Sequence, residues 1–240
     1  NCILSPIHFD YTRMSPAGRE YNAPANLVID TYGPPPFGTL LSANADGSTL
    51  TNFGSDEARW LTLHQIGNWR EHNTYWYLTE VFRDANPPLP ALNGEPFYPG
   101  WPPSGIAGDS EEAECASRSG MYGSVLSGGL AGHIYGVQGV WGGDIEPESS
   151  PKMWEGLQWR SGAQVQHLGT FILSERARYQ DLAPDADLVY PQRTIEVLGN
   201  TGWAYCARTP DRGLFMIYFE RGLAGLGGLD NPRRAGIRGA

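Results

Sequence analysis

The sequence WLTLHQIGNWREHNTYWYLTEVFRDANPPLPALN, residues 60–93, decides the fold because it contains a strand, a helix and a second strand in succession. Each strand is a short apolar segment with polar or proline residues at its ends, which is typical of strands that are buried. Between the strands, Asn73 can cap a helix, and Pro87 and Pro88 can stop it. We therefore expect strands at 60–66 and 90–93 and a helix at 73–82.

The same alternation continues on both sides of this unit. Three more apolar segments predict strands, at 2–9, 38–43 and 133–141. Two more segments predict helices, at 110–126 and 151–173. The first of these helices begins with an acidic turn and ends before Gly128, and the second is weakest at Gly162. Strands that alternate with helical crossovers indicate a parallel α/β architecture.

Five such strands indicate the later part of a (β/α)8 barrel, because a complete barrel needs about 250 residues. We expect residues 1–187 to form about strands four to eight of the barrel, with the earlier strands preceding Asn1. A doubly wound sheet is the alternative. Its glycine fingerprint should open the first helix after a strand, but the glycine-rich stretches 128–132 and 222–228 lack that context.

The pattern changes after Pro184. Alternating polar and apolar residues predict strands at 194–198 and 203–208. A Pro-Asp-Arg-Gly turn at 210–213 and an apolar run at 214–219 follow, which indicates an antiparallel hairpin. We expect residues 188–240 to be the start of a small, β-sandwich-like domain whose tail is loose from residue 222 onwards.

The composition excludes several classes of protein. With 40% apolar and 12% aromatic residues, a chain of 240 residues is neither disordered nor a disulfide-stapled miniprotein. No apolar run approaches the roughly 20 residues of a membrane helix. The net charge of -9 repels phosphate backbones, so we expect neither a nucleic-acid partner nor a membrane partner. The 8 Trp and 12 Tyr residues favour flat, uncharged ligands such as sugars.

The cysteines and the first residues add no motif. Cys2, Cys115 and Cys206 are widely spaced and form no CxxC pair, which leaves one disulfide with one free thiol as an open alternative. An apolar segment begins directly after Asn1, so there is no signal peptide to read.

Two acidic residues are the candidates for catalysis, because the active site of a parallel barrel lies at the carboxyl ends of its strands. Asp10 and Glu95 each follow a predicted strand, and cleavage of a glycosidic bond requires a pair of carboxyl groups. Next to Glu95, Gly94 permits another group to approach the backbone closely, and Pro96 ends the strand. Ordinary structural roles, a loop acid for Glu95 and a cap for Asp10, remain the alternative.

Further polar and aromatic residues gather after the same strands. Hydroxyl groups of a sugar need hydrogen-bonding partners, and its C–H faces stack on aromatic rings. We expect the following residues to bind substrate: His8, Asn44, His64, Gln65, Asn68, His72, Tyr98, Trp101, His133, Tyr135 and Trp141.

A metal-dependent hydrolase is a rival interpretation, with candidate ligands His8, Asp10, His64, His133 and Asp144. No HxH or HExxH pair supports it, and no GxSxG elbow supports a serine nucleophile. A carbohydrate-binding protein that has the pocket without catalysis is a third interpretation. In the hydrolase that we favour, two carboxyl groups suffice and no cofactor is expected.

Three runs of sequence resemble the apiosidase-like glycoside hydrolases: ALNGEPFYPGW, RSGMYGSVLSGGLAGHIYGVQGVW and WRSGAQVQHLGTFIL. The resemblance covers residues 2–219 and implies a TIM barrel followed by a small β domain that is labelled collagen-binding. It also implies a retaining arrangement, with an acid/base carboxyl after the fourth barrel strand and a nucleophile after the seventh. These positions match Asp10 and Glu95. The family more often has Gly-Gly-Asp where this chain has His8-Phe9-Asp10.

The sequence therefore predicts a glycoside hydrolase that acts on oligosaccharides or polysaccharides of plants or microbes. We expect such a protein to be secreted or periplasmic.

Overall fold

The computed structural model describes residues 3–4, 19–44, 47–54, 56–67, 75–190, 203–220 and 236–237. Its central sheet has the strand order β3-β4-β5-β6, with bounds Gly47–Ser48, His64–Gly67, Ala91–Asn93 and Gly132–His133. Strands β4, β5 and β6 are parallel, as predicted, whereas the unpredicted β3 is antiparallel to β4.

A second parallel pair lies beside this sheet. β1 (Ile3–Leu4) pairs with β2 (Leu40–Leu41). The carbonyl of Leu41 accepts hydrogen bonds from the backbone N–H groups of Thr62 and Leu63, just before β4 begins. The parallel strands therefore follow one another in chain order, which is the arrangement that the alternating pattern predicts.

The predicted strand at 133–141 is much shorter than expected. β6 ends at His133, and residues 134–141 leave the sheet. The backbone N–H of Gln138 donates to the carbonyl of Pro99 instead of to a neighbouring strand. Gly139, with φ of 86°, then adopts a backbone conformation that a strand residue does not. The apolar run of this segment is therefore a loop that packs on the loop after β5.

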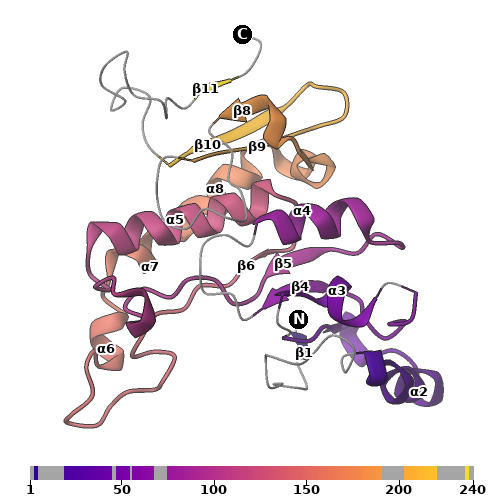
Figure 1. Cartoon of the computed structure of the whole chain (residues 1–240), viewed down its shortest axis with the longest axis horizontal. Helices are drawn as coiled ribbons and strands as arrows, with labels where there is room; N and C mark the ends of the chain where they lie inside the picture. The colour runs from indigo at the N-terminus through magenta and orange to yellow at the C-terminus, as the bar shows by residue number, and fades with distance from the viewer. Residues whose placement is uncertain are drawn as a thin grey trace.

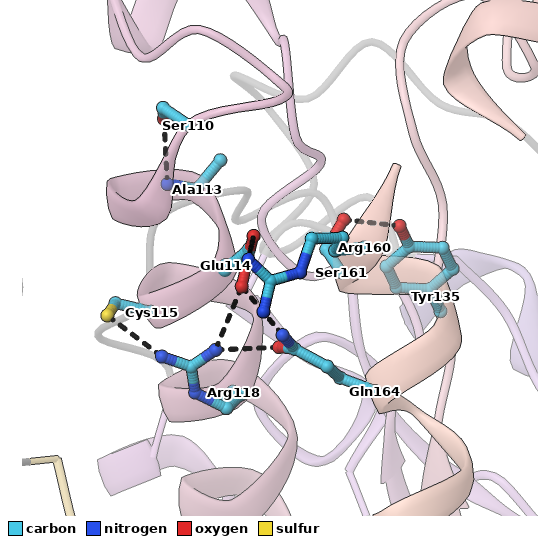
Figure 2. Close-up of polar contacts among 9 residues, drawn as sticks. All are labelled: Ser110, Ala113, Glu114, Cys115, Arg118, Tyr135, Arg160, Ser161 and Gln164. Carbon is cyan, nitrogen blue, oxygen red and sulfur yellow. Dashed lines mark hydrogen bonds and ion pairs between the residues drawn. The ribbon is translucent and has the colours of Figure 1, made fainter. Parts of the chain in front are cut away.

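The helices α4 (Tyr75–Asp84) and α5 (Glu111–Leu126) confirm the two central predictions. The Ser110 side chain caps α5 by accepting a hydrogen bond from Ala113 N–H, as Figure 2 shows. The predicted cap of α4, Asn73, lies outside the described residues. Tyr75, Leu78 and Val81 form the buried face of α4, while Phe82 is 45% exposed.

The predicted helix at 151–173 is broken into three. These are α6 (Met153–Gly156), α7 (Arg160–Gln164) and α8 (Gln166–Ile172). The first break falls at Trp159, whose backbone is extended with φ of −66° and ψ of 137°. Gly162, the expected weak point, lies inside α7. Short 3-10 helices also occur, at Pro36–Gly38, Pro102–Ser104, Leu173–Asp181 and Ala186–Leu188.

Two helices were not predicted from the sequence, α2 (Asn22–Tyr32) and α3 (Thr49–Phe53). α2 has little amphipathic pattern, because apolar side chains such as Leu27 and Val28 are more than half exposed. Hydrogen bonds fix it instead: the Asn22 amide donates to the Phe53 carbonyl at 2.7 Å and accepts from Trp60 Nε1 at 2.8 Å.

The predicted hairpin is present as β9 (Ala204–Arg208) and β10 (Phe215–Phe219). β7 (Ala183–Pro184) pairs with β9, so this sheet begins before residue 188, and β8 (Val189–Tyr190) pairs with β11 (Gly236–Ile237). The predicted strand at 194–198 and most of the tail after 222 lie outside the described residues.

The molecule has three layers, with α4 and α5 between the central sheet and the hairpin (Figure 1). One apolar core joins the helices to the hairpin; its buried members are Tyr75, Val125, Leu126, Ile172, Leu182, Trp203, Tyr205, Ala207 and Met216. Among the described residues, no helix has the length and apolarity to cross a membrane.

We predict that Gly123→Ala destabilises the protein, because a Cβ at this position of α5 would lie 2.5 Å from Cε1 of Tyr75. The expected loss is about 1–3 kcal/mol of unfolding free energy, as for other overpacked cores. Gly169→Ala in α8 is the matched control, since nothing lies within 4 Å of where its Cβ would be and alanine favours a helix. Urea denaturation of both variants checks this; equal stabilities would contradict the tight contact.

Candidate active site

The carboxylate of Glu95 lies two residues beyond the carboxyl end of β5 and is 4% exposed. Nδ2 of Asn44, which follows β2, donates a hydrogen bond of 2.7 Å to Oε2 of Glu95. Nε2 of Gln65, on β4, donates in turn to Oδ1 of Asn44 at 3.2 Å. Three of the predicted site residues therefore converge, one from β4 and two from the residues that follow β2 and β5.

The two hydrogen bonds that link Gln65, Asn44 and Glu95 run in one direction, from Gln65 through Asn44 to Glu95. Because Oδ1 of Asn44 accepts from Gln65, the Asn44 amide presents its N–H group to Glu95. A hydrogen bond from an amide N–H to an ionised carboxylate is stronger than one between neutral groups. The arrangement suits a buried carboxylate that must stay in one orientation.

Two residues of the β5 segment support this geometry. A Cβ on Gly94 would lie 2.4 Å from Cδ of Gln65, so only glycine lets the Gln65 side chain cross this point. Asn93 accepts from the Glu95 backbone N–H through Oδ1 and donates to Oγ of Ser124 on α5 through Nδ2, at 3.3 and 3.1 Å. The sequence patterns assigned Asn93 no role, although its position at the strand end was a usable signal.

His64 points away from Glu95, so its role in substrate binding stays a prediction. Side chains alternate along β4, and His64 shares a face with Ile66, which packs against α4. Nδ1 of His64 contacts Oγ1 of Thr49 at 2.9 Å. That oxygen also accepts from the Gln65 backbone N–H, so Thr49 links the His64 ring to the backbone of its own strand.

His133 is also directed away from Glu95. It lies beside Asn93 in the parallel register, and a Cβ on Gly120 of α5 would be 3.7 Å from Cε1 of its ring. Burial lowers the pKa of His64 to about 4 and that of His133 to about 3. Among the described residues, neither Nε2 of His64 nor Nδ1 of His133 has a hydrogen-bond partner. Both rings belong to the packing between sheet and helices.

The aromatic candidates are spread over the rim beyond β5 and β6. The Tyr98 ring is 7% exposed and lies against Gly136, whereas Trp141 is 59% exposed and Trp101 is half-buried. The Tyr135 hydroxyl is 2.8 Å from Oγ of Ser161 on α7 (Figure 2), and burial raises the Tyr135 pKa. Trp101 and Trp141 therefore have more ring surface available for stacking than Tyr98.

Four candidates lie outside the described residues: His8, Asp10, Asn68 and His72. The separation of Asp10 from Glu95 thus stays a prediction. In the part of the chain that the structure describes, no three His, Cys, Asp or Glu side chains come together as a metal site. The metal interpretation placed its five ligands partly on His64 and His133, which face the helices.

Residues 37–178 match the family model described as "Apiosidase-like, catalytic domain". This match covers more than half of the chain and includes Asn44, Gln65 and Glu95. The chain belongs to the apiosidase-like family. The resemblance seen in the sequence is thereby confirmed for the part of the chain that carries the Glu95 cluster.

A solved structure described as a glycoside hydrolase is similar to this apiosidase-like chain at 20% sequence identity and a TM-score of 0.57. The alignment covers 79% of this chain and 45% of the other, so the apiosidase-like chain spans less than half of that structure's length. At this identity the similarity shows the fold alone. No curated protein matches the chain.

We predict that Gly94→Ala in the apiosidase-like domain disrupts the site more than the fold. The added methyl group overlaps Gln65, which then loses its hydrogen bond to Oδ1 of Asn44. Under the function proposed below, kcat/KM toward a glycoside should fall on the order of 100-fold, because a small displacement of a catalytic group has an effect of this size. The measurement compares kcat/KM with the urea midpoint of unfolding. Full activity would show that Gln65 does not orient Asn44.

Stability should fall as the pH is lowered from 6.5 to 4. The folded-state pKa of His64 is below its unfolded value of 6.5, so the unfolded chain binds more protons in this range. Each such histidine contributes a slope of up to about 1.4 kcal/mol per pH unit. His64→Gln should remove its share of the slope. Urea unfolding of this variant and of the unsubstituted protein between pH 4 and 7.5 measures this; identical slopes in the two proteins would contradict it.

Proposed function

We propose that this protein is a glycoside hydrolase in which Glu95 is the nucleophile and Asp10 the acid/base. The buried carboxylate of Glu95, held by Asn44 at the carboxyl ends of the parallel strands, is the observation that carries the proposal. A nucleophile in this chemistry must be ionised and must keep one orientation toward the anomeric carbon. Membership of the apiosidase-like family supports the same assignment.

The proposed reaction has two steps. An oxygen of Glu95 attacks the anomeric carbon while the bond to the leaving oxygen breaks, and Asp10 gives its proton to that oxygen. Asp10 then takes a proton from water, which attacks the same carbon and releases Glu95. Retention of configuration requires the two carboxyl groups to be roughly 5–5.5 Å apart, and inversion requires about 6.5–9.5 Å.

The finer description of the fold is also a proposal. The parallel strands are those of the later part of a (β/α)8 barrel formed by residues 1–187, and residues 188–240 begin a small β domain. Exposed apolar side chains on α2, such as Leu27, Val28 and Tyr32, support the barrel because a neighbouring helix would cover them. The length of the similar solved structure supports it as well.

The proposed substrates are plant or microbial oligosaccharides and polysaccharides, and the proposed compartment is secreted or periplasmic. Exposed Trp141 and half-buried Trp101 beyond the strand ends support a sugar ligand, since indole rings stack on C–H faces.

Glu95→Gln in the intact protein should abolish turnover while it spares sugar binding, because glutamine keeps the shape of the side chain and lacks the nucleophilic charge. Exposed Glu148 provides the matched control, Glu148→Gln, which should keep full activity. The assay is a screen against plant cell-wall oligosaccharides and 4-nitrophenyl glycosides, with product stereochemistry followed by NMR. Retained turnover in Glu95→Gln would remove Glu95 from the mechanism. Affinity without turnover in the unsubstituted protein would indicate a carbohydrate-binding protein instead.

A further inference from the structure

Two loops beyond the central sheet form one continuous rim. Residues 94–110 follow β5 and carry Glu95, and residues 134–152 follow β6. The backbone N–H of Ile134 donates to Asn93 C=O at 3.1 Å, and that of Gln138 donates to Pro99 C=O at 3.0 Å. Backbone hydrogen bonds therefore join the two segments both next to Glu95 and at Pro99.

Trp159 is wedged against the loop that carries Glu95. A Cβ on Gly100 would lie 2.7 Å from Cη2 of the Trp159 ring, and a Cβ on Gly108 would lie 2.1 Å from the same atom. Gly100 comes five residues after Glu95, and Gly108 comes shortly before α5 begins. The indole ring thus touches the loop at two places, where only glycines leave room for it.

The backbone of Trp159 is anchored independently of this loop. Trp159 is the N-cap residue of α7, and Glu114 of α5 contacts two residues of α7, Arg160 and Gln164, as Figure 2 shows. Oε1 of Glu114 pairs with Nη1 of Arg160 at 3.5 Å, and Oε2 accepts from Nε2 of Gln164 at 2.6 Å. Glu114 is 7% exposed, whereas the side chain of Arg160 is 81% exposed, so the hydrogen bond from Gln164 anchors α7 more than the ion pair with Arg160 does.

The same turn of α7 holds the second loop. Oγ of Ser161 lies 2.8 Å from the hydroxyl of Tyr135, two residues beyond β6 (Figure 2). Residues 159–161 therefore contact the loop of Glu95 through an indole ring and the loop of Tyr135 through a hydroxyl group.

We propose that Trp159 is a positioning residue that holds the Glu95 loop in its reactive geometry by filling the space over Gly100 and Gly108. The proposal rests on the glycosidase function proposed above, because it assigns no chemistry to the indole ring itself. Trp159 acts through the loop, and its removal leaves a void beside residues that lead directly back to Glu95. A carboxylate that is displaced by about 1 Å can lose on the order of 100-fold in rate.

The test compares Trp159→Ala, Trp159→Phe and Trp154→Ala in the intact protein, with a 4-nitrophenyl glycoside on which the unsubstituted protein is active. Trp154, on α6, is 46% exposed and is the matched control. We expect kcat of Trp159→Ala, corrected for the folded fraction by circular dichroism, to fall on the order of 10- to 100-fold while KM changes less. Trp159→Phe should restore most of kcat, and Trp154→Ala should match the unsubstituted protein.

A second variant covers the case in which Trp159→Ala does not fold. Gly108→Ala keeps the indole ring but places a methyl group where the ring lies, so it should lower kcat in the same way. If folded Trp159→Ala, or Gly108→Ala in its place, keeps the kcat of Trp154→Ala, the positioning role is overturned. Glu95→Gln separates the two proposals. Turnover in that variant refutes the proposed function. If Glu95→Gln is inactive and Trp159→Ala has an unchanged kcat, only the positioning role is refuted.

Discussion

The arrangement of this protein depends on the need to give a buried carboxylate a fixed hydrogen-bond donor. Glu95 is almost completely removed from water, and an ionised group in such a place is costly unless its partners are in position. Asn44 supplies one donor, and Gln65 determines which end of the Asn44 amide faces the acid. The three side chains come from β2, β4 and β5 or from the residues that follow these strands, so the site exists only when the parallel sheet is assembled.

Helix α5 connects the Glu95 site to the rest of the molecule through hydrogen bonds on two sides. On one side, Ser124 accepts a hydrogen bond from Asn93, which in turn accepts from the backbone of Glu95. On the other side, the hydroxyl of Ser119 donates to the carboxylate of Glu220, beyond β10, and this carboxylate also accepts from Tyr205 at 2.9 Å. α5 thus links the site to the hairpin through polar contacts as well as through the shared apolar core.

The sequence predicted the elements that depend on regularly spaced apolar residues. It did not predict which side of a strand a polar side chain faces. The strands at 64–67 and 91–93 and the helices α4 and α5 follow from apolar periodicity, from the acidic first turn of α5 and from proline breaks. His64 and Gln65 are adjacent polar residues in one strand, and alternation guarantees that they face opposite sides. Only the packed structure shows that Gln65 faces Glu95 and His64 faces the helices. The contacts of Trp159 could not be predicted from the sequence either, because the glycines that its ring contacts are far from it in the sequence.

The sequence by itself determined the order of parallel strands and crossovers, the hairpin after residue 203 and the candidacy of Glu95, since all of these depend on local patterns of apolar, glycine, proline and acidic residues. The tertiary structure alone decided the direction of each strand-end side chain, the break of the helix at Trp159 and the partners of Glu95. The physical reason is that these features arise from contacts between segments tens of residues apart, whose energies exceed the weak local preferences that a sequence pattern records.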